Sequence, residues 1–401
     1  MTLKKAAEIN IALYAFVAMN PFFRWILPNE LFYALFLGTT IFITLLLIIY
    51  CPRLIGYNNS YKKIVLTYLV LFILYMATPI IHDMRWGHLL WYIPLILIVS
   101  YDDTLIVNSY HILRKIIVWI SIFSLIILFI KEIGISLPYF RLNVDFRYSP
   151  LDNYRCYGPI VSLYHGGSPF EVFGIERICG AFAEPGHFGI YLGLILVIEK
   201  FDFSKSYNKI LLIAGLFTFS TAFYGILFLG LIYSAFVKRS EAKYWISIIG
   251  LTFLIILFWD YLNEFLFNSS VNALEDIADV ADNRIPDQFI EAFDVFIEST
   301  DALFGVGYYT TYYNDVKLAI TNWRGFVFSF GFVGLILIIT LPIIIIRRTK
   351  SVLYQLLMFG AFLIVFLHRS YLLYTPWMYI LLYFAVTLDC YNNRIKISEY
   401  E

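Results

Sequence analysis

Charged side chains are scarce in this 401-residue chain. Asp, Glu, Lys and Arg make up 14% of the residues, whereas a soluble globular domain carries about 25%. Hydrophobic residues reach 61%, and the mean hydropathy is +0.76. This composition disfavours a soluble enzyme and favours a chain that crosses the membrane several times. The balanced formal charge gives no indication of a nucleic-acid partner.

Motifs for nucleotide and metal chemistry are also missing. The sequence contains no Walker loop, no G-x-S-x-G elbow, no H-E-x-x-H pair and no Cys/His cluster at metal-ligand spacing. We therefore expect neither a cofactor nor a metal.

Long apolar stretches are abundant instead. They predict an all-α polytopic membrane protein that forms one integral domain over residues 1–401, and the first stretch, from Ala7, resembles a signal anchor. The candidate spans lie at about 8–28, 31–50, 64–81, 88–101, 116–133, 186–199, 210–237, 245–265, 325–346, 353–367 and 372–390.

Clusters of Lys and Arg orient these spans. Short loops rich in Lys and Arg remain cytoplasmic, but residues 210–237 have such clusters at both ends, so a single crossing would place one of them on the wrong face. We therefore divide this run near Ser220-Thr221 into a short hairpin of two short or re-entrant passes. The result is about twelve passes with both termini in the cytoplasm and two long outward loops, about 134–185 and 266–324.

Arginine dominates the predicted outer face. The outer side carries 9 Arg and 2 Lys, against 6 Arg and 12 Lys inside. A guanidinium fork holds two phosphate oxygens at once, so the bias suits a lipid diphosphate; pairing with loop acids and headgroups is the alternative. The outer arginines are Arg24, Arg85, Arg141, Arg147, Arg155, Arg177, Arg284, Arg324 and Arg369.

Two further segments carry acidic residues. After Pro286, apolar and acidic residues alternate at helical spacing, which predicts a helix on the membrane surface that either packs on the bundle or acts as a lid. Asp102-Asp103 falls on the cytoplasmic side beside Arg114, where we expect solvation. Cys156 and Cys179 share the first outer loop, and a disulfide between them is one alternative.

One stretch just before the sixth span combines charge with backbone-shaping residues. It reads ERICGAFAEPGHFG and contains Arg177, Gly180, Glu184, Pro185 and His187. Together with the overall plan it resembles the R-x-x-G-x-F-x-E-P segment of the O-antigen and capsule repeat-unit polymerases (Wzy-type). The motif covers about a dozen residues, and the related O-antigen ligases share much of the layout. The resemblance implies a GT-C-like membrane fold of about 12 transmembrane helices.

The resemblance also implies a reaction. Such a polymerase transfers a glycan from one polyprenyl diphosphate to another lipid-linked repeat unit at the outer face of the bacterial cytoplasmic membrane, in O-antigen, capsule or exopolysaccharide synthesis. Its partners would be the lipid-linked oligosaccharide, membrane lipids and a chain-length regulator. Because the leaving group is a stabilised anion, the protein supplies charge, positioning and a base for the sugar hydroxyl.

These requirements assign roles to individual residues. We expect Glu184 or His187 to deprotonate or orient the acceptor hydroxyl, and Arg177 to hold the diphosphate as part of the same catalytic group. Gly180 and Pro185 match the backbone positions of the motif. The diphosphate and substrate would be held by outer cations: Arg147, Arg155, Arg284, Arg324, Arg369 and His368. Arg284 resembles the arginine that often begins the helix of the second loop.

Three alternatives remain at this stage. One is a purely structural or partner-binding membrane protein, because nothing in the sequence demonstrates turnover; the other two are a ligase and a flippase. An O-antigen ligase usually carries a His before the Asn that precedes the next span, whereas this chain has Thr321 before Asn322. A lipid-linked-oligosaccharide flippase would need ionisable groups near the middle of the bilayer, and the predicted spans are almost free of charge between their ends.

Overall fold

The computed structural model describes most of the chain as helices. The described residues are 2–19, 21–22, 31, 34–54, 59–77, 92–141, 154–158, 160–164, 175–182, 184–237, 287–307, 323–369, 373 and 376–398. Two helices, α7 (Asp103–Glu132) and α15 (Trp323–Ile346), are long and apolar enough to cross a bilayer. The chain divides into two compact units: Met1–Ile117 with Ile285–Glu401, and Val118–Arg284.

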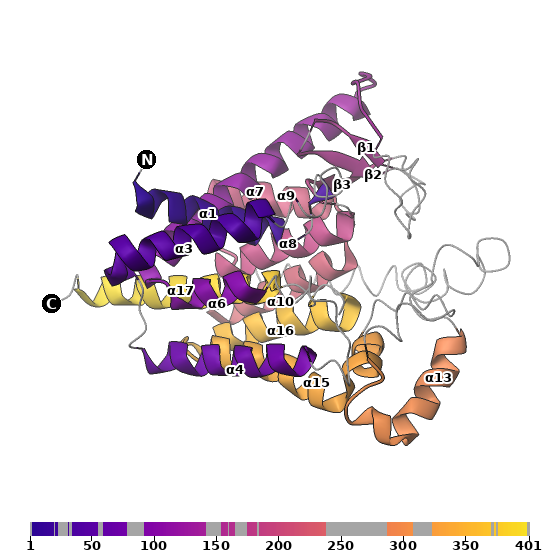
Figure 1. The fold of residues 1–401 in the computed structure, drawn as a ribbon. Helices are drawn as coiled ribbons and strands as arrows, with labels where there is room; N and C mark the ends of the chain where they lie inside the picture. The colour runs from indigo at the N-terminus through magenta and orange to yellow at the C-terminus, as the bar shows by residue number, and fades with distance from the viewer. Residues whose placement is uncertain are drawn as a thin grey trace. The chain divides into compact units, whose positions relative to one another are not determined.

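The first unit is a helical bundle (Figure 1). Its helix α15 packs against α4, α16 and α17, and an aromatic cluster of Phe72, Tyr92, Phe362 and Tyr379 lies between the helices. Its elements are α1 (Leu3–Val17), η2 (Ala34–Gly38), α3 (Thr39–Tyr50), η3 (Pro52–Leu54), α4 (Ser60–Met76), α6 (Tyr92–Ser100), the start of α7, α13 (Asp287–Glu298), η7 (Thr300–Ala302), α15, α16 (Val352–Arg369) and α17 (Trp377–Ser398).

The second unit combines helices with a small sheet (Figure 1). Helix α8 (Pro185–Ile198) is buried along its whole length between α9 (Ser206–Leu216), α10 (Thr221–Val237) and β3. The antiparallel sheet has the order β1 (Tyr154–Cys156), β2 (Ser162–Tyr164) and β3 (Arg177–Gly180). An all-α fold was expected, so the sheet corrects that expectation. Strands of three or four residues are too short to show a reliable alternation in sequence.

Most described residues of the predicted spans are helical, although α1 ends at Val17, well before the end of the first predicted span. The span at 245–265 lies outside the described residues. The apolar run 210–237 is divided into two helices near the predicted position, Ser220-Thr221. Helix α9 ends at Leu216, and α10 begins at Thr221. Phe219 at this turn has a φ of 47°, a strained value for a bulky side chain. The 11 residues of α9 rise only about 16 Å, which suits a re-entrant pass better than a full crossing.

Helix α15 is interrupted near its middle. Gly331 has φ 64° and ψ −176°, and a Cβ there would lie 2.4 Å from the carbonyl oxygen of Leu303. The turn 303–307 fills the break: Val306 N–H donates to Phe328 O at 2.9 Å, and Val333 N–H donates to Leu303 O at 3.1 Å. Backbone groups released by the interruption are thereby paired, as an apolar environment requires.

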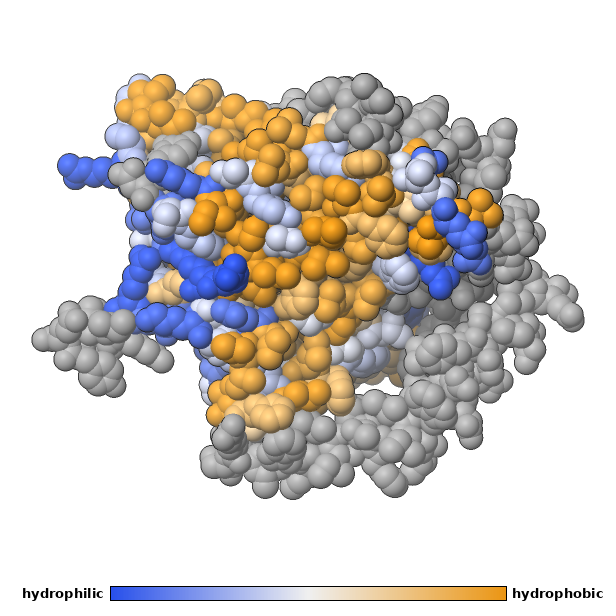
Figure 2. All heavy atoms as spheres, turned by 90° about the horizontal axis from the view of Figure 1, so that it is seen from below, coloured by the Kyte–Doolittle hydropathy of each residue, from blue (hydrophilic) through white to orange (hydrophobic). Residues whose placement is uncertain are grey.

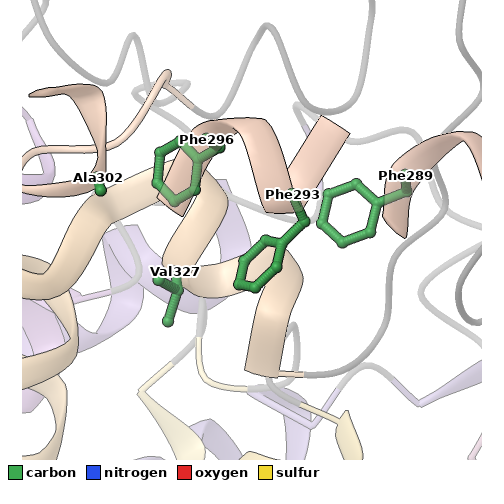
Figure 3. Close-up of a cluster of buried hydrophobic side chains, with 5 residues drawn as sticks. All are labelled: Phe289, Phe293, Phe296, Ala302 and Val327. Carbon is green, nitrogen blue, oxygen red and sulfur yellow. The ribbon is translucent and has the colours of Figure 1, made fainter. Parts of the chain in front are cut away.

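Helix α13 packs against α15 through a buried apolar cluster that includes Ala302, just before this turn. Figure 3 shows Phe289, Phe293 and Phe296 of α13 with Val327 of α15 and Ala302, and all five side chains are buried. Of the two alternatives for this amphipathic helix, the structure shows packing on the bundle. Its predicted acidic stripe lies partly among exposed residues, including Asp294 and Glu298.

The carboxylate of Asp103 corrects another expectation. It is buried and pairs with three cations: Arg348 through two hydrogen bonds, Lys62 at 3.4 Å and Arg394 at 3.4 Å. Burial opposes ionisation, but the Arg348 hydrogen bonds and the cationic charges outweigh it and lower the pKa of Asp103. At Lys62 burial prevails over the attraction of Asp103, so the pKa of that ammonium falls. The residues next to Asp103 in the sequence did not indicate that Lys62, Arg348 and Arg394 would be its partners.

Candidate functional site

The stretch that contains Arg177 and Glu184 joins three parts of the second unit. Strand β3 begins at Arg177, α8 begins at Pro185, and the turn between α9 and α10, residues 217–220, packs against both. We call this turn the hairpin tip. Each residue of the motif has a structural role that its type explains.

The backbone residues of the motif set close contacts. Gly180 has a φ of 58°, and a Cβ there would lie 2.8 Å from the Phe188 ring. The ring of Phe182 lies 5.6 Å from that of Phe188 and 5.4 Å from that of Tyr191. Pro185 is the first residue of α8, where its missing N–H costs no helical hydrogen bond. The chain therefore turns sharply from β3 into α8 with Glu184 between them.

Glu184 and His187 form a pair at the N-terminus of α8. The carboxylate Oε2 lies 3.8 Å from His187 Nε2, and the side chains are 33% and 8% exposed. Glu184 is the N-cap residue, yet its side chain makes no capping hydrogen bond. A carboxylate beside an imidazole can accept a proton from a hydroxyl and pass it on. The helix dipole favours negative charge at this position.

Arg177 is engaged with the hairpin tip. Its Nε donates to Thr218 O at 3.1 Å, and its Nη2 donates to Phe219 O at 3.0 Å. The sequence predicted Arg177 for this site, although nothing in the sequence indicated the tip carbonyls as its partners.

Arg155 pairs with a buried carboxylate. Its Nη1 lies 2.9 Å from Oε1 of Glu176, whose side chain is fully buried, and its guanidinium lies 5.4 Å from the Tyr139 ring centroid. Lys131 of α7 contacts the same carboxylate. The buried carboxylate is thus held by two cations, which identifies Glu176 and Lys131 as residues that sequence reasoning missed. Neither belongs to a recognisable spacing pattern.

The first unit holds two of the predicted cations at one end of a helix pair. Arg324 is in the first turn of α15, with its guanidinium 5.8 Å from the ring centroids of both Phe293 and Trp323. Arg369 is the last residue of α16. The rings of Phe326 and Phe366 lie 5.8 Å apart, so the ends carrying Arg324 and Arg369 are adjacent.

Some predicted residues cannot be placed. Arg147 and Arg284 lie outside the described residues, as do Thr321 and Asn322. His368 belongs to α16, but its side chain is likewise outside the description. Among the described residues, no group of three or more His, Cys, Asp or Glu is placed to hold a metal ion.

The two cysteines of the first outer loop are unpaired thiols. Cys156 and Cys179 are buried on β1 and β3, with β2 between those strands. Outer strands of a three-stranded sheet are about 10 Å apart, beyond the reach of a disulfide. Burial raises the pKa of the Cys156 thiol to about 12 and raises that of Cys179 well above its ordinary value.

Comparisons with known proteins add nothing to this geometry. No protein-family model, curated protein sequence or solved structure matches the chain.

Proposed function

We propose that the chain is a polytopic membrane glycosyltransferase of the repeat-unit polymerase type. It transfers a growing glycan from one polyprenyl diphosphate to another lipid-linked repeat unit at the outer face of the bacterial cytoplasmic membrane. The observation that carries the proposal is the Glu184–His187 pair, placed at the start of α8 by the motif that resembles this family.

The surface supports placement in a membrane. Figure 2 shows that apolar side chains cover much of the visible face. Large apolar side chains are exposed on helices of the first unit, including Phe42 (61%), Ile49 (66%), Leu74 (60%) and Ile336 (63%). Helices that expose such residues need an apolar surrounding, because monomeric soluble proteins rarely expose large contiguous apolar patches. We propose about twelve passes with both termini in the cytoplasm.

The reaction assigns a proton and a leaving group. The acceptor hydroxyl attacks the anomeric carbon of the donor, the bond from that carbon to the diphosphate oxygen breaks, and polyprenyl diphosphate departs. Glu184, with His187 beside it, takes the hydroxyl proton. Positive charge for the diphosphate comes from outward-facing cations, as the sequence leads us to expect. No step requires a metal.

A conservative substitution tests this assignment. Glu184→Gln keeps the size of the side chain and removes the base, and the absence of a capping hydrogen bond at Glu184 predicts little loss of stability. We expect cells with this variant to make normal amounts of folded protein and surface glycan of one repeat unit only. Full-length polysaccharide at normal protein levels would refute the assignment. A matched control is Glu298→Gln, an exposed glutamate at the end of α13.

A further inference from the structure

We propose that Arg177 is a positioning residue: it fastens the hairpin tip to β3 and thereby holds the Glu184–His187 pair, and it does not grip the donor diphosphate. This inference rests on the proposed function and deepens it. It also replaces the role that the sequence suggested for Arg177.

The hydrogen bonds of β3 carry the inference. Three successive carbonyl oxygens of the hairpin tip accept from two neighbouring residues of β3. Ile178 N–H donates to Phe217 O at 3.0 Å, Arg177 Nε donates to Thr218 O at 3.1 Å, and Arg177 Nη2 donates to Phe219 O at 3.0 Å. A guanidinium that spans two adjacent carbonyls has fixed its plane and orientation. It acts here as a clamp on the backbone.

The electrostatics of the tip explain why an arginine is needed. The clamped carbonyls follow the last residue of α9, Leu216, where the helix dipole places partial negative charge. A cation at this end stabilises the helix, and a side chain that reaches past the terminus also pairs carbonyls that no helical N–H can reach. Lysine offers the same charge but no planar fork, so it can satisfy only part of this arrangement.

The tip in turn abuts the first turns of α8. A Cβ at Gly189 would lie 2.6 Å from Ser220 Cβ and 2.7 Å from Thr218 Oγ1, so these two side chains of the tip pack directly on the backbone of α8. Gly189 follows His187 by two residues. Phe219 is held at a φ of 47°, a conformation that persists only when surrounding contacts impose it. Release of Arg177 would let the tip relax and would loosen its contact with the first turns of α8, which carry His187.

Hydrogen exchange tests the clamp itself. In the full-length protein in detergent, Arg177→Ala should raise the exchange rates of the amides of residues 217–224 and of Ile178 by about tenfold or more, because their local opening becomes easier. Residues 191–197 of α8 should keep their protection, which shows that the variant is folded. The matched control is Lys209→Ala, which removes an exposed cation from the same hairpin. Unchanged exchange at the tip in Arg177→Ala would overturn the inference.

Turnover separates positioning from diphosphate binding and from a purely structural role. The substrate is the lipid-linked oligosaccharide extracted from cells that carry Glu184→Gln. We expect Arg177→Ala to lower kcat by about 100-fold, the scale of a slight misplacement of catalytic groups, with KM for the lipid donor unchanged. Arg177→Lys should recover part of kcat. A raised donor KM with normal kcat would identify a diphosphate contact, and unchanged kinetics would leave only a structural role; either result overturns the inference.

The two measurements also distinguish failure of this inference from failure of the proposed function. If the wild-type protein transfers no glycan, the proposed function is wrong and the catalytic role of Arg177 falls with it, while hydrogen exchange still decides whether Arg177 fastens the tip. If the wild type is active and Arg177→Ala is equally active, the proposed function stands and the inference is wrong.

Discussion

The interruption of α15 gives a sharp prediction about stability. Gly331 and Gly305 face each other across the break, and both have positive φ, 64° and 85°. A Cβ at Gly331 would lie 2.4 Å from the oxygen and 2.5 Å from the carbon of the Leu303 carbonyl, and 2.6 Å from Gly305 N. All three contacts are with backbone, which cannot swing aside as a flexible side chain can. The perturbation is therefore Gly331→Ala.

The magnitude has two parts. The conformation at Gly331 belongs to a region that is essentially restricted to glycine, which costs about 1–3 kcal/mol for any other residue. Forcing a methyl group into the closed contact adds about 1–3 kcal/mol of overpacking. A total near 4 kcal/mol would lower the Tm of a unit of this size by about 10 °C.

The assay is thermal unfolding of the purified protein in detergent, followed by intrinsic fluorescence at a fixed scan rate. The matched control is Gly38→Ala at the start of α3, where φ is −60° and a Cβ would meet nothing within 4 Å. Alanine at Gly38 should leave the free energy of unfolding unchanged or raise it by up to about 1 kcal/mol, so Tm should stay the same or rise slightly. The double variant Gly305→Ala/Gly331→Ala should cost less than the sum of the single variants, since both disrupt one contact. Equal Tm values for Gly331→Ala and Gly38→Ala would refute the close packing of the 303–307 turn against Gly331.

Two further predictions concern buried ionisable groups. Asp103→Asn should cost about 3–5 kcal/mol in thermal unfolding, because it leaves Lys62 and Arg348 without their counter-ion. Since the pKa of Asp103 is lowered in the folded protein, its stabilisation is present above the ordinary carboxyl pKa of about 3.9 and is lost as pH falls through the lower folded value. Tm should therefore not respond to this group between about pH 5 and 8; an unchanged Tm in Asp103→Asn would contradict the pairing. The thiols of Cys156 and Cys179, buried and with raised pKa, should resist iodoacetamide at about pH 8 in the folded protein and react fully after denaturation without reductant, as peptide mass spectrometry can show. Modification of the native protein, or a need for reductant, would contradict their description as buried free thiols.

Much of the helical framework was predictable because apolar length is a local property of the sequence. The hairpin break between Leu216 and Thr221 was located from cations at both ends of a single apolar run. The interruption at Gly331 was not predicted from the sequence. A glycine within an apolar stretch gives the same local pattern whether or not another segment packs against it. The small sheet was missed for a similar reason: its pairing of residue 164 with residue 177 depends on contacts across a long loop.

The site shows the same division between local and distant contacts. Glu184 and His187 are three residues apart on one helix, so their proximity followed from the sequence. The partners of Arg177 are 41 and 42 residues away, and those of Asp103 include Arg348, 245 residues away. Residue type identified these groups as candidates for charge pairing. Only the fold assigned their partners, which are backbone carbonyls for Arg177 and the cations Arg348, Lys62 and Arg394 for Asp103.

The central claim is that Glu184 serves glycan transfer between lipid carriers at the outer face of the membrane. The most direct measurement is mass spectrometry of lipid-linked glycans from cells that carry Glu184→Gln, combined with a membrane-impermeant label that reports the leaflet. The account predicts accumulation of polyprenyl diphosphate bearing a single repeat unit, accessible from outside. Accumulation of inaccessible, inward-facing single units would indicate a flippase and would contradict the account, as would a wild-type distribution of lipid-linked chains.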